Sequence, residues 1–86
     1  MVRPSRPFAV REHPRFTAKV AEVLGDFWAW EDIKATLDLD VAIDPMAFPL
    51  IPETDLRAVQ LNTDPPHAVY FTVHPEGGYI QYENIF

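Results

Sequence analysis

Three histidines are the side chains of this sequence that ordinarily change charge near neutral pH, and they are its first candidates for catalysis. They are His13, His67 and His74. His67 and His74 are seven residues apart, an odd separation that places two side chains of one regular strand on opposite faces of a sheet. This spacing disfavours a catalytic pair or a shared metal ion. Each histidine also stands beside a proline or at the end of an expected element, where a structural role is the ordinary interpretation.

The acids Asp38, Asp40 and Asp44 could bind a divalent cation, but they alternate with apolar residues. A calcium loop needs alternate acids around a glycine turn and a distal glutamate. We therefore interpret these acids as the polar face of a helix. The sequence predicts neither a metal site nor a cofactor.

Nucleophilic catalysis has few candidates. The chain has no cysteine, and its single serine is Ser5. Thr63 and Thr72 have no general base nearby in the sequence. The pair Gly77-Gly78 is typical of a hairpin, because no helix follows it to cradle a phosphate.

The charge of −6 is unevenly distributed over the 86 residues. Residues 1–19 hold five basic residues and one acid, whereas the rest of the chain holds two basic residues and twelve acids. An acidic body repels phosphate, so binding of nucleic acid is disfavoured. The same charge favours a protein partner of opposite charge. The candidate partner-binding cations are Arg3, Arg6, Arg11 and Arg15.

The positions of proline and apolar residues divide the chain into a basic, proline-rich arm at residues 1–7 and one domain at residues 8–86. A short strand near residues 8–12 is followed by an apolar stripe of helical spacing from Phe16 to Phe27. A second helix begins near residues 26–29. Three strands follow near residues 56–61, 68–73 and 79–86. The order β-α-α-β-β-β predicts an α+β fold, in which two helices pack on one face of a small antiparallel sheet.

Residues 37–43 have two interpretations. Their alternating pattern is typical of a strand, whereas the row Ile33, Leu37 and Val41 continues a helix. We favour a helix that ends before Asp44-Pro45, since the residue preceding proline avoids the α conformation. On this helix Trp28 and Trp30 point to different sides. An exposed tryptophan often marks a partner surface, so both are candidate partner-binding residues.

The element order and several segments resemble the RelE/ParE superfamily of small bacterial toxins from toxin–antitoxin pairs. The resemblance covers roughly residues 8–86. It rests on Phe8 to Phe16, on Asp44-Pro45, on the segment from Thr54 to Val59, on the run His67 to Val73, and on Tyr79 to Tyr82. It implies a cytoplasmic bacterial protein, of the kind that stabilises plasmids, with an antitoxin segment as its partner.

The departures from the family concern catalysis. His67 stands where the ribonuclease members carry an arginine before the central strand, and no arginine ends the strand that begins near Leu56. Cleavage of RNA needs cations that offset charge on the phosphate. Our leading hypothesis is therefore a non-catalytic or degenerate member that binds a protein. An active ribonuclease using Arg57 and His67 is the alternative, and an unrelated phage or plasmid accessory domain is a third.

Residues 1–7 lack the apolar core of a signal peptide, and no stretch reaches the ~18 apolar residues of a membrane span. We expect a cytoplasmic protein without a membrane partner. The sequence is compatible with a homodimer.

Overall fold

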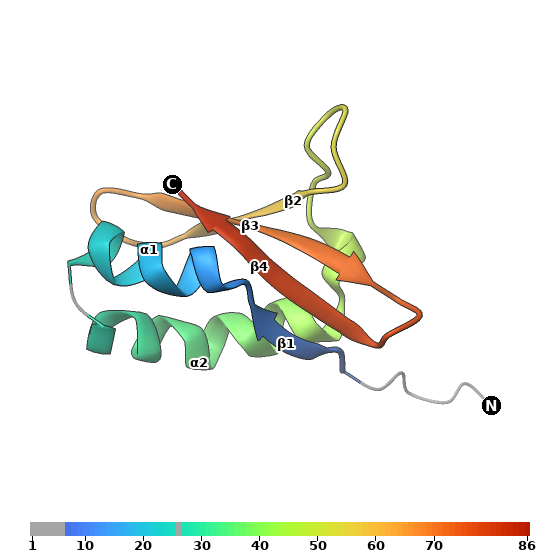
Figure 1. The fold of residues 1–86 in the computed structure, drawn as a ribbon, viewed down its shortest axis with the longest axis horizontal. Coiled ribbons are helices and arrows are strands. Elements are labelled where there is room, and N and C mark those ends of the chain that lie inside the picture. The colour runs from blue at the N-terminus through green and yellow to red at the C-terminus, as the bar shows by residue number, and fades with distance from the viewer. Residues whose placement is uncertain (1–6, 26) are drawn as a thin grey trace.

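The computed structural model describes residues 7–25 and 27–86 (Figure 1). Most of the predicted arm, including Arg3 and Arg6, lies outside these ranges. The elements are β1 (Ala9–Glu12), α1 (Pro14–Leu24), α2 (Phe27–Ile43), the short 3-10 helix η1 (Pro45–Ala47), β2 (Arg57–Leu61), β3 (His67–His74) and β4 (Tyr79–Ile85). The predicted α+β class and the order β-α-α-β-β-β are confirmed.

The strands form one sheet in the order β1-β4-β3-β2. β2, β3 and β4 are an antiparallel meander, as predicted. β1 differs from the prediction, because it pairs with β4 in parallel and makes the sheet mixed. The chain leaves β1 into two helices rather than a hairpin, so no tight turn forces β1 to run antiparallel. In this register Val10 lies opposite Ile80, which is fully buried.

The ends of α1 follow from local chemistry. At its start, Nδ1 of His13 accepts the backbone N–H of Arg15 at 3.0 Å, and Pro14 occupies a first-turn position, where its missing N–H costs nothing. At its end, Gly25 adopts a φ of 76°, a left-handed conformation that glycine tolerates best. The side chain of His13 thus caps the start of α1, and Gly25 ends the helix.

α2 continues through residues 37–43, so the helical interpretation of that segment is confirmed. Val41 is buried, whereas Leu39 and Ile43 are 65% and 67% exposed. The apparent strand alternation arose because these two apolar residues lie on the outer side of the helix. α2 ends at Ile43, just before Asp44-Pro45.

Both helices pack on the same face of the sheet. Phe16 of α1, Trp30 of α2 and Tyr82 of β4 form an aromatic cluster, with ring centroids 5.2 to 5.9 Å apart. The hydroxyl of Tyr82 donates a hydrogen bond of 2.6 Å to the carboxylate of Asp38. Burial, together with this bond, raises the pKa of Tyr82 well above its usual range. Tyr82 thus fixes α2 against the sheet.

Within residues 7–25 and 27–86, the other face of the sheet carries no helix (Figure 1). Antiparallel sheets often expose one face in this way. Among the helices of residues 7–25 and 27–86, none combines the length and apolarity needed to cross a bilayer.

Candidate functional site

The two residues proposed for ribonuclease catalysis are not brought together. In the β2–β3 register Arg57 lies opposite Phe71 and His67 lies opposite Leu61. Four residues along a strand separate the two positions by about 13 Å. The Arg57 guanidinium donates to the carbonyl of Phe48 at 2.8 Å, and Nδ1 of His67 lies 3.0 Å from the carbonyl oxygen of Phe86.

Arg11 and Arg15, the two described residues among the predicted partner-binding arginines, both contact β4. The guanidinium carbon of Arg11 lies 3.9 Å from the ring centroid of Tyr79. Arg15 contacts both the carbonyl and the carboxylate of Glu83, although its side chain is 58% exposed. In the described ranges, then, these two cations are paired with an aromatic ring and a carboxylate of their own chain.

The proposal that Trp30 marks a partner surface is wrong. Trp30 is 1% exposed and belongs to the core. It continues the row of Ile33, Leu37 and Val41, which is the inner side of α2. Spacing within a helix separates Trp28 from Trp30 but does not say which of them points inward. The side chain of Trp28 lies outside the described part of the chain.

A polar network occupies the uncovered face of the sheet. Thr72, only 7% exposed, donates from its hydroxyl to the carboxylate of Glu83 at 2.9 Å and lies 2.8 Å from Nε2 of His74. Because its one proton is committed to Glu83, the Thr72 oxygen accepts from an Nε2–H of His74. Gln81 and Arg15 donate to the same carboxylate. The network lines a hollow of about 480 Å³ together with Asp55 and Tyr70.

This network was not predicted from the sequence, in which Thr72 has no general base nearby. Two signals could have found it: Thr72 and His74 share one face of a strand, and the strand after the hairpin returns Glu83 beside them. Chemically, a carboxylate that already accepts three side-chain hydrogen bonds is a poor general base. The main role of the network is therefore structural, because its hydrogen bonds connect α1, β3 and β4.

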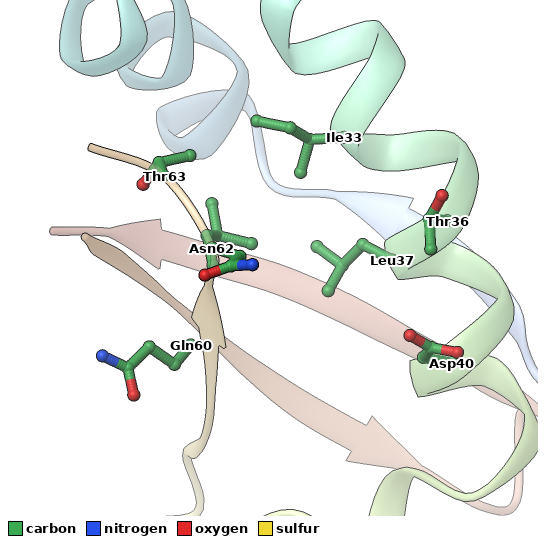
Figure 2. Close-up of a pocket in the computed structure, with 8 residues that line it drawn as sticks. Ile33, Thr36, Leu37, Asp40, Gln60, Asn62 and Thr63 are labelled. Carbon is green, nitrogen blue, oxygen red and sulfur yellow. The ribbon is translucent and has the colours of Figure 1, made fainter. Parts of the chain in front are cut away.

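A second hollow lies between α2 and β2 on the helix-covered side (Figure 2). Its volume is about 270 Å³. Ile33 and Leu37 of α2 face Leu61 of β2 and form its apolar walls. Its rim is polar and consists of Thr36, Asp40, Gln60, Asn62 and Thr63. We call this cavity the edge pocket. The edge pocket can accommodate an apolar side chain of a bound segment beneath α2.

The edge pocket adjoins an unpaired strand edge. The backbone N–H of Ala58 donates away from β3 to the carbonyl of Pro49 at 3.0 Å. Residues two apart in a strand present their backbone groups on the same side, so the N–H and C=O of Gln60 also point away from β3. The segment Pro49–Ile51 covers only the start of β2, through a bridge from Leu50 to Arg57. In the described ranges, no strand pairs with the outer side of Gln60.

No family model matches the sequence, and no curated protein matches it significantly. The fold and the site thus define a small α+β protein with an open strand edge above an apolar pocket, and the case for its function rests on that geometry.

Proposed function

We propose that this chain is a RelE/ParE-like, non-catalytic protein that acts in the cytoplasm by binding a partner protein such as an antitoxin. The partner adds a short extended segment to the sheet beside β2. The observation that carries this proposal is the unpaired backbone of Gln60 directly above the edge pocket. Strand addition to an exposed edge is a common mode of peptide recognition, in which backbone hydrogen bonds give affinity and side-chain pockets give specificity.

The geometry suits such an added strand. Successive side chains of a strand point to opposite faces of the sheet. Every second residue of the added segment therefore points toward α2, and one of these side chains enters the edge pocket between Ile33 and Leu37. The residues between them point to the uncovered face. An apolar side chain that becomes fully buried contributes about 1.5–3 kcal/mol to binding.

Charge favours a different, basic protein over a second copy of this chain. Asp40 lines the edge pocket, and no lysine or arginine of the described residues does so. Two copies paired through β2 would bring two Asp40 side chains and two chains of net charge −6 together. Like charges across an interface reduce affinity, whereas a basic segment gains from the same field.

Ribonuclease activity receives no such support. Its two candidate residues lie at opposite ends of the β2–β3 pairing, and the guanidinium of Arg57 is bound to backbone carbonyls. A phosphate in a cleavage transition state needs unpaired cations. Arg11 and Arg15, on the uncovered face, each have an intramolecular contact.

The test is co-expression with the product of the adjacent reading frame, followed by affinity capture and growth measurements. Gln60→Pro removes only an outward-facing N–H, a change that edge strands tolerate. Loss of one backbone hydrogen bond weakens capture about three- to tenfold. Gln60→Ala keeps this N–H and removes a side chain that points away from α2 and the cavity (Figure 2), so it is the matched control and retains capture.

A second pair of variants tests the pocket. Ile33→Trp fills the space beneath α2 and abolishes capture, whereas Ala35→Trp adds the same bulk at an exposed position of α2 outside the pocket and leaves capture unchanged. The neighbour should also relieve any growth defect caused by this chain. Harmless expression combined with failure of the neighbour to co-purify would contradict the proposal, and so would capture unaffected by Gln60→Pro and Ile33→Trp.

A further inference from the structure

A second hollow, of about 290 Å³, adjoins the edge pocket where α1 ends and α2 begins. Ile33 and Thr63 line both cavities. The second hollow, which we call the end pocket, has apolar walls from α1 and α2 and a rim from the β2–β3 connection. It is lined by Val23, Leu24, Ala29, Ile33, Thr63, Asp64, Pro65 and His67. The two cavities are therefore neighbours on either side of Ile33, and we refer to them together as the groove.

The spacing of the two cavities matches a strand. On α2 the edge pocket is lined from Ile33 to Asp40, and the end pocket from Ala29 to Ile33. The midpoints of these stretches are five to six residues apart, or about 8 Å at 1.5 Å per residue. Two side chains on the same face of a strand, two residues apart, are separated by about 6.6 Å. One extended segment can therefore place consecutive same-face side chains in both pockets.

Each pocket has one carboxylate on its rim. Asp40 belongs to the edge pocket and Asp64 to the end pocket. Both residues are exposed, and no lysine or arginine lines either cavity within residues 7–25 and 27–86. The groove thus combines apolar walls with one acidic group beside each of its two cavities.

From this arrangement we infer that the partner segment has the pattern basic–polar–apolar–polar–apolar–polar–basic, in which the apolar and basic side chains share the face toward α2. Its two apolar side chains lie in the edge and end pockets, and its basic side chains lie near Asp40 and Asp64. This inference rests on the proposed strand addition beside β2 and names the chemistry of the segment that is added. The occupant is a basic extended segment of a different protein. Because both carboxylates are exposed, they contribute little to the affinity of binding and act mainly on its specificity.

The experiment uses two capped peptides, Lys-Thr-Val-Thr-Val-Thr-Lys, in which valines and lysines share one face, and the same peptide with glutamate in place of lysine. Binding is followed by NMR titration of the whole chain, with the amides of Gln60, Leu61 and Asn62 as reporters. The wild-type protein prefers the lysine peptide, by about two- to fivefold for each charge. The double variant D40K/D64K reverses the ranking. At 1 M salt, where the screening length is about 3 Å, the preference largely disappears.

The end pocket is tested with peptides that carry alanine in place of either valine. Each replacement weakens binding to the wild-type protein about three- to tenfold. Ala29→Leu fills the end pocket, so this variant no longer distinguishes valine from alanine at one of the two positions, while it still does at the other. Ala35→Leu, on the exposed side of α2, is the control and behaves as the wild type.

The outcomes separate the two proposals. Binding that moves the reporter amides but ignores D40K/D64K and Ala29→Leu would overturn the inferred pattern and leave strand addition standing. A lack of response at Gln60 to either peptide up to millimolar concentration would overturn the pattern together with the strand addition. Slowed tumbling of the free chain that Gln60→Pro abolishes would identify a second copy as the occupant and also overturn the pattern.

Discussion

Substitution of Tyr82 by phenylalanine should change how the stability of this protein depends on pH. Tyr82 is buried and donates to Asp38, and both features favour its neutral form. In the unfolded chain the phenol ionises near its ordinary pKa of 10.0, whereas in the folded chain its pKa is far higher. Above pH 10 unfolding therefore releases a proton, and the free energy of unfolding falls by about 1.4 kcal/mol per pH unit. Below that pH the contribution is fully present.

Tyr82→Phe removes this dependence and also the hydrogen bond to Asp38. Loss of the bond lowers the free energy of unfolding by about 1–2 kcal/mol at neutral pH. The difference in the free energy of unfolding between the wild type and the variant stays constant up to about pH 10. It falls to zero about one pH unit higher. Urea denaturation from pH 7 to pH 11 measures both quantities. Tyr70→Phe, on the uncovered face of the sheet, is the control. A gap that stays constant up to pH 11 would refute the assigned role of Tyr82 in fixing α2 against the sheet.

Three further changes test other parts of the structure. Arg57→Ala loses charged hydrogen bonds to two loop carbonyls, lowers the free energy of unfolding by about 1–3 kcal/mol and speeds amide exchange at Ala58, whereas Arg57→Lys has a smaller effect. Glu83→Gln weakens the network on the uncovered face by a similar amount in thermal melts; an equal loss in Glu76→Gln, on the hairpin loop, would contradict this. Gly25→Ala strains a φ of 76° and costs about 1 kcal/mol in urea denaturation, and no loss would argue against the left-handed cap of α1.

Much of the fold was accessible from the sequence, because each element carries its own local signal. Helical spacing and Pro14 located α1, and Asp44-Pro45 located the end of α2. The direction of β1 was not accessible. A strand that is followed by two helices can join either edge of the meander in either direction, and tertiary packing of Val10 opposite Ile80 decides the outcome.

The candidate site was less accessible, since it depends on how closely α2 packs against β2. The apolar character of Ile33 and Leu37 marks them as inward-facing, but it does not show that they leave a cavity beside β2. The rim of the end pocket comes from the connection after β2, and no periodic sequence pattern predicts the conformation of that connection. For the same reason, charge counting predicted a basic partner without locating the acids that line the groove.

The open part of β2 departs from the way in which sheets usually protect their edges. Exposed strand edges invite pairing with other chains, and natural proteins cover them or place charges beside them. Here Pro49–Ile51 covers the first part of β2, and Arg57 holds the preceding loop through carbonyls of Met46 and Phe48. Within the described part of the chain, the stretch beside Gln60 is left open, and the apolar groove lies there. Under the proposed strand addition, the carboxylates that line this groove oppose pairing between two acidic copies and attract a basic segment. On that proposal, the same charges protect the edge from self-association and select what binds to it.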